Sequence, residues 1–112
     1  MQIDFSQFSA SERYHIMTQT IIPRPIAWAL TESSHDNYNL APFSYFTAVS
    51  SQPALLMLSV GKKPNGESKD TLTNIINNKN MVIHIASMNQ AECVTQTVAT
   101  LAHGESELEK AI

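Results

Sequence analysis

Residues 39–61 read NLAPFSYFTAVSSQPALLMLSVG, and they contain the longest strand-like segment of the sequence. Its first part, residues 39–51, is rich in aromatic and β-branched residues, which favours a strand. Pro42 lies inside this strand and cannot donate to a ladder hydrogen bond, so we expect a bulge or a sheet edge there. Pro53 interrupts the chain, and residues 54–61 then predict another strand. The stretch therefore indicates a mainly β protein, and patterns elsewhere in the sequence add helices.

Two further predicted strands flank this stretch. Residues 26–31, IAWALT, lack helical periodicity and predict a strand buried on both faces. Residues 81–87, MVIHIAS, predict another. Four strands are fewer than the six to eight, roughly, that close a small barrel. We therefore expect an incomplete barrel, whose open edge is covered by further strands or by another subunit.

Capping-box patterns predict where helices begin. They lie at Ser9-x-x-Glu12, Ser87-x-x-Gln90 and Ser106-x-x-Glu109. The first predicts a short helix over residues 10–17. The second predicts a helix that carries Val94, Val98 and Leu101 on one face and ends before Gly104.

A further helix is predicted between the third and fourth strands. Leu72, Ile75 and Ile76 recur at i, i+3 and i+4, so we expect them to form its apolar face. Ser68 or Asp70 can cap its start, because both side chains accept hydrogen bonds from the first turn.

The connection into this helix is GKKPNGES, residues 61–68, whose glycines have the spacing of a Walker A loop. Glu67 stands where that loop needs lysine, and a carboxylate there would repel nucleotide phosphates. We therefore expect a plain strand-to-helix connection, in which Pro64-Asn65-Gly66 forms the turn.

The next residues, Lys69, Asp70 and Thr71, suit a phosphate monoester. A helix start offers backbone N–H groups and a positive dipole end, to which Lys69 adds a charge and Thr71 a hydroxyl. Taken alone, however, these residues favour a simpler interpretation: Asp70 caps the helix and Lys69 is solvated.

A flat heterocycle could lie along residues 39–46. Pro42 interrupts strand pairing, and unpaired backbone groups nearby need a partner. Asn39 and Ser44 add polar groups, while the aromatic residues of NLAPFSYF supply flat apolar walls. The alternative is a bulged edge strand with aromatic core residues.

Arg24 and Trp28 form a third candidate element. Pro23 and Pro25 hold Arg24 in an extended segment, which orders its guanidinium in advance, although a surface arginine is as good an interpretation. Trp28 is most simply a core residue whose indole N–H needs one partner.

Composition excludes several functions. The chain has 112 residues, which suits a single domain over residues 1–112, and its net charge of −3 comes without a basic block, so nucleic-acid binding is not indicated. No apolar run is long enough to span a membrane, and no secretory signal is visible. Cys93 is alone, which fits the reducing cytoplasm. The four histidines show no metal-ligand spacing, and no catalytic residue or metal site is assigned; we expect His84 to be half-buried.

Three motifs occur in order: RPIAWALT, NLAPFSYFTAVSSQPALLMLSVG and KDTLTNI. With them the chain resembles the flavin reductase-like family, which has the FMN-binding split β-barrel fold of Greek-key type. The resemblance runs from about Glu12 to the end of the sequence. Because family members usually continue past this length, the resemblance implies the N-terminal portion of the family's domain.

The resemblance also implies non-covalent FMN at a homodimer interface. The positions that match the family's cofactor-binding residues are Arg24, Trp28, Thr31, Asn39, Leu40, Ala41, Pro42, Ser44, Thr47, Lys69, Thr71 and Asn74. Of these, Lys69, Thr71 and Asn74 would serve the phosphate. The segment around Pro42 would line the isoalloxazine, largely through backbone groups.

The implied reaction is that of an NAD(P)H-dependent flavin reductase. NAD(P)H delivers hydride to flavin N5, and reduced FMN passes electrons to an acceptor that the sequence does not identify. Three rival functions are open. The first is an FMN-binding electron carrier without a nicotinamide site, the second a truncated non-catalytic remnant, and the third a binding module for another phosphate ligand such as pyridoxal phosphate.

Overall fold

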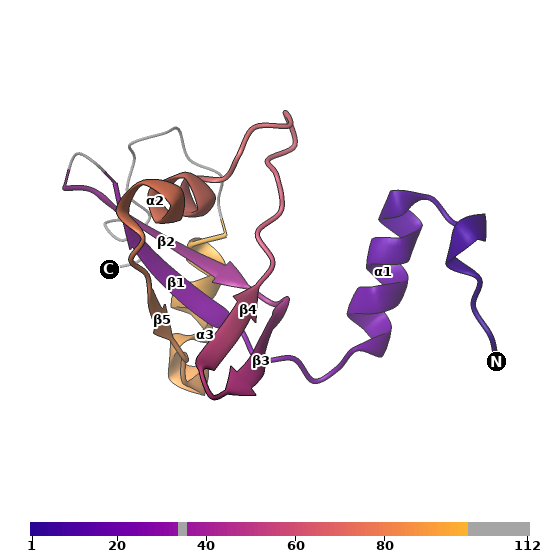
Figure 1. The fold of residues 1–112 in the computed structure, drawn as a ribbon. Helices are drawn as coiled ribbons and strands as arrows, with labels where there is room; N and C mark the ends of the chain where they lie inside the picture. Colours follow the sequence, from indigo (N-terminus) through magenta and orange to yellow (C-terminus); the bar gives the residue numbers. More distant parts are fainter. Residues whose placement is uncertain (34–35, 99–112) are drawn as a thin grey trace.

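The computed structural model describes residues 1–33 and 36–98 (Figure 1). The helices are η1 (Phe5–Gln7), α1 (Ala10–Thr20), α2 (Asp70–Asn78), η2 (Met88–Gln90) and α3 (Ala91–Gln96). The strands are β1 (Ala27–Glu32), β2 (Tyr38–Phe43), β3 (Phe46–Ser51), β4 (Ala54–Leu58) and β5 (Val82–His84).

A three-stranded antiparallel sheet carries most of the buried apolar residues. Its order is β2-β1-β5, with Trp28 of β1 opposite Pro42 on one side and His84 on the other. Ala27 and Ala29 are fully buried, and Trp28 is 9% exposed, so β1 is covered on both faces as predicted. Pro42 lies in the edge strand of this sheet, which confirms its predicted place, because an edge strand can spare one backbone donor.

The predicted single strand over residues 39–51 is two strands. β2 ends at Phe43, Ser44 and Tyr45 turn the chain, and β3 leaves to pair with β4 in a separate two-stranded sheet. The register of this pairing shifts between Ala48 and Ser50. The prediction was wrong because enrichment in aromatic and β-branched residues does not reveal that the chain changes from one sheet to the other.

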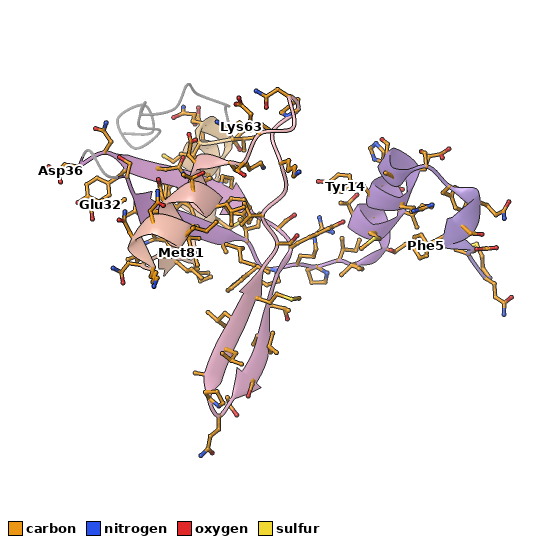
Figure 2. All side chains as sticks on the ribbon, turned by 45° about the horizontal axis from the view of Figure 1, so that its top comes forward. Phe5, Tyr14, Glu32, Asp36, Lys63 and Met81 are labelled. Carbon is orange, nitrogen blue, oxygen red and sulfur yellow. The ribbon has the colours of Figure 1, made fainter. Side chains whose placement is uncertain are left out.

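The β3–β4 hairpin is a ribbon with little cover. Figure 2 shows it projecting from the body of the molecule, with side chains on both of its faces. Val49, Leu55, Leu56 and Met57 are each about half to three-fifths exposed. The two sheets are not closed over the described residues, in agreement with the incomplete barrel expected from the sequence.

Helix α1 lies to one side of the sheets (Figure 1). Its predicted capping box is confirmed: Ser9 N–H donates to the Glu12 carboxylate at 2.8 Å, and Glu12 N–H donates to Ser9 Oγ at 3.3 Å. The helix runs three residues past the predicted end, to Thr20. Tyr14 packs its ring on Tyr45, with centroids 5.9 Å apart, and so joins the helix to the turn between β2 and β3.

The capping box at Ser87 and Gln90 is also present, and it begins the segment formed by η2 and α3. Leu101, Gly104 and the third predicted capping box lie outside the described residues. No helix in the described part is both long and apolar enough to cross a membrane. The described residues hold no group of three or more metal-ligating side chains, and His84 is exposed rather than half-buried.

Candidate functional site

The loop before α2 is a tight hairpin. Gly66 N–H donates to the Lys63 carbonyl at 2.9 Å, and Lys63 N–H donates to the Glu67 carbonyl at 2.8 Å. Gly66 has φ of 85°, a left-handed conformation that favours glycine. The arrangement is a turn followed by a left-handed residue, a common three-residue hairpin connection. The predicted turn is therefore confirmed, and the loop places the start of α2 beside the sheet.

Neither predicted residue caps α2. Lys69 is the N-cap residue and makes no side-chain capping hydrogen bond. Asp70 is the first helical residue, and its carboxylate instead accepts from Lys63 Nζ at 3.2 Å. This salt bridge ties the hairpin loop to the helix that follows it.

Lys69 is placed against the usual preferences of a helix start. A cation there opposes the positive end of the helix dipole, and a lysine cannot accept the hydrogen bond that an N-cap residue normally accepts. Its Nζ lies 5.4 Å from the centroid of the Phe43 ring, which is buried in β2. No carboxylate of the described residues pairs with Lys69, whose side chain is half-buried. A partly covered ammonium without an anion is a suitable contact for an anionic ligand.

The face of α2 that meets the sheet is polar. Asn39 Nδ2 donates to Thr71 Oγ1 at 2.8 Å, and Asn74 Nδ2 donates to Thr31 Oγ1 at 3.1 Å. These four residues are only 1–7% exposed. The structure thus brings four predicted site residues together, but it engages their polar side chains with one another.

The apolar face predicted for α2 is therefore wrong in orientation. Leu72 and Ile75 are only half-buried, and Ile76 is 65% exposed. The residues that face the sheet are spaced i, i+3 and i+7, namely Thr71, Asn74 and Asn78. Asn78 Nδ2 donates to the backbone carbonyl of Glu32. A hydrophobicity pattern cannot identify this face, because its contacts are hydrogen bonds.

Strand β2 places the segment expected along a flavin ring. Leu40 is buried, while Ala41 and Pro42 are half-buried. Ser44, also half-buried, follows at the turn into β3. Thr47 lies in β3, in the other sheet, with an exposed side chain.

Trp28 and Arg24 make contacts within the chain. Trp28 Nε1 donates to Thr97 Oγ1 at 3.0 Å, which gives the indole the partner that the sequence required. Thr97 was not singled out in the sequence, and nothing in its local pattern distinguishes it. Arg24 Nη1 donates at 2.7 Å to the carbonyls of Thr18 and Ile21, so the guanidinium holds the end of α1.

Arg24 also lies against Tyr45, with its guanidinium carbon 5.8 Å from the ring centroid. Arg24 Nε and the Tyr45 hydroxyl are buried without a hydrogen-bond partner among the described residues. Such atoms are unusual in folded proteins and call for a partner.

Comparison with known proteins gives the family. The model of the flavin reductase like domain matches residues 17–111. Nitrilotriacetate monooxygenase component B from Bacillus cereus superposes with a TM-score of 0.90 at 35% identity, covering 99% of this chain and 55% of its own. The 2-nitrobenzoate 2-nitroreductase NbaA of Pseudomonas fluorescens superposes with a TM-score of 0.85 at 28% identity. The match covers 99% of this chain and 52% of NbaA.

A split-barrel-domain protein from Shewanella frigidimarina shares the fold, with a TM-score of 0.76 at 20% identity over 98% of this chain and 55% of its own. The chain spans about half the length of the curated relatives that it matches, at 49% and 53% for two of them. The two neighbours are thus a monooxygenase component and a nitroreductase, each about twice as long as the part that this chain matches. The chain belongs to the flavin reductase-like family, and its two sheets have that family's split-barrel arrangement, which is not closed over the described residues.

Proposed function

We propose that the protein binds FMN at the start of α2 and along β2, and acts as an NAD(P)H-dependent flavin reductase. The proposal rests mainly on the position of Lys69 at the start of α2. A half-buried cation at an uncapped helix start costs stability unless an anion is present. A phosphate monoester supplies that anion, and the flavin reductase-like family supplies the flavin.

The residues present fit the phosphate end of FMN. Lys69 Nζ has no carboxylate partner among the described residues, and the ring of Phe43 beneath it limits its hydration. The phosphate would accept from Lys69, and the ring would lie along Leu40, Ala41, Pro42 and Ser44. Arg24, Trp28 and Thr47 are proposed to lie near the cofactor without a defined contact.

The protein's part in the reaction is to bind and orient. A bound flavin supplies hydride acceptance at N5, which needs no acid or base from the chain. Backbone groups near Pro42 orient the ring, and Lys69 fixes the opposite end of the molecule. Covering the ring with β2 side chains limits the access of water to the reacting face.

The partners and location belong to the proposal as well. NAD(P)H is the proposed reductant, and the acceptor is an unidentified oxidant. A homodimer is supported by the exposed apolar residues of the β3–β4 hairpin, which a second copy would cover. The lone Cys93 supports a cytoplasmic location.

The test is a titration of the purified chain with FMN, followed by a steady-state assay of NADH and NADPH oxidation. We expect a flavin absorption spectrum that stays with the protein, and NAD(P)H oxidation that depends on added FMN. Flavin binding without NAD(P)H oxidation would favour the electron carrier. A protein without flavin absorption bands after incubation with FMN, whether it binds pyridoxal phosphate or no phosphate ligand, would overturn the proposal.

A further inference from the structure

Three hydrogen bonds between described residues join α2 to β1 and β2, and we call them the polar latch. Two join side chains, Asn39 to Thr71 and Asn74 to Thr31, and the third joins Asn78 to the backbone of Glu32. The latch replaces the apolar contact that usually packs an amphipathic helix on a sheet.

The chemistry of the latch determines what it can do. Apolar contacts are non-directional, so by themselves they set the orientation of a helix less strictly than hydrogen bonds do. Hydrogen bonds are directional, and a buried polar group left without its partner is costly. The latch therefore fixes both the rotation of α2 and its position along β1.

The same residues are poorly placed to touch a ligand. Thr31, Thr71 and Asn74 are 1–3% exposed and Asn39 is 7% exposed. The Asn39–Thr71 and Asn74–Thr31 hydrogen bonds run between the sheet and α2, so a ligand would have to separate the two elements to reach the bonded atoms. Lys69 differs, because it is half-buried and has no carboxylate partner among the described residues.

We propose that Thr31, Asn39, Thr71 and Asn74 are positioning residues rather than FMN ligands. They hold the start of α2 against the sheet and thereby set where Lys69 meets the phosphate. The placing of Lys69 at the phosphate rests on the proposed FMN function, whereas the latch itself is a property of the fold.

The test compares Thr31→Val with Thr31→Ser. Valine keeps the shape of threonine but removes the acceptor of Asn74, whereas serine keeps the hydroxyl. Asn77→Ala is the matched control, because Asn77 is an exposed amide on the same helix outside the latch. We expect Thr31→Val to lower hydrogen-exchange protection of the α2 amides and to weaken FMN binding about tenfold. We expect Thr31→Ser and Asn77→Ala to change the protection of the α2 amides and the affinity for FMN by no more than about twofold.

A double-mutant cycle separates positioning from direct contact. If Thr31 acts through Lys69, adding Thr31→Val to Lys69→Ala weakens FMN binding by no more than about twofold further. Full additivity of the two losses would overturn the proposal, since it identifies Thr31 as a separate ligand contact. Unchanged α2 protection in Thr31→Val would overturn it too. If the unaltered chain binds no FMN, the proposed function fails, and the protection difference between valine and serine still decides whether the latch exists.

Discussion

Replacing Lys69 by serine is expected to weaken FMN binding while making the protein more stable. The two effects have separate physical origins at one position. Lys69 is the N-cap residue of α2 without a capping hydrogen bond, and its ammonium has no carboxylate partner among residues 1–33 and 36–98. The substitution therefore removes no stabilising ion pair of the described structure.

The magnitude for binding follows from the contact that is lost. A hydrogen bond between an ammonium and a phosphate contributes about 1.5–3 kcal/mol. Because Lys69 is only half-buried, we take about 2 kcal/mol, which corresponds to a Kd raised about 30-fold. The magnitude for stability follows from the cap. A serine N-cap stabilises a helix by about 1 kcal/mol, which raises Tm by about 4 °C for a chain of this size.

The assay is quenching of flavin fluorescence for Kd and thermal unfolding without flavin for Tm. Lys79→Asn is the control. It also removes one positive charge from α2, at the opposite end, and asparagine tolerates the left-handed conformation of residue 79. An equal loss of affinity in Lys79→Asn would show that only net charge matters. A Kd for Lys69→Ser within about twofold of the original would refute the assignment of Lys69 to the phosphate.

Three further outcomes test the fold around the site. Trp28→Phe leaves Thr97 Oγ1 without its buried donor and is expected to lower the free energy of unfolding by about 1–3 kcal/mol in urea titrations. Gly66→Ala is expected to lower Tm through backbone strain alone, because φ is 85° and nothing lies within 4 Å of the added Cβ; Gly66→Asn costs less. The Ser9 hydrogen bonds lower the pKa of Glu12, so the capping box stabilises α1 fully above pH 4.5, the ordinary value, and this stabilisation is lost as pH falls through the lowered pKa. Hydrogen-exchange rates of the α1 amides, measured as a function of pH, test this loss of stabilisation. The variant Glu12→Gln serves as the control, because it lacks the titrating carboxyl group.

Local signals predicted the elements whose causes are local. The capping boxes at Ser9 and Ser87 and the turn at Gly66 depend on a few adjacent residues, and each is present in the structure. The burial of β1 was also predictable, because an uninterrupted apolar run needs cover on both faces. Pro42 limited its strand to an edge for an equally local reason, the missing N–H.

What the sequence hid depends on contacts between distant residues. The hydrogen bond between Thr31 and Asn74 joins residues 43 positions apart, and no pattern within α2 predicts that its polar side faces the sheet. The split of residues 39–51 between two sheets depends on which strand each half meets. For the site, the motifs gave Asn74 and Lys69 one role, although the side chain of Asn74 is buried and that of Lys69 is partly exposed.

The uncovered β3–β4 hairpin has a consequence for handling the protein in solution. β4 reads ALLML, a five-residue run without charge or proline, and within the described residues each strand of the ribbon pairs only with the other. Runs of this composition on unpaired strand edges promote intermolecular strand addition. Aggregation through the hairpin is therefore expected to increase with protein concentration. Light scattering across a dilution series will detect the aggregates before any loss of secondary structure. A charged substitution at the exposed Leu56 should raise the solubility limit while leaving the β2-β1-β5 sheet intact.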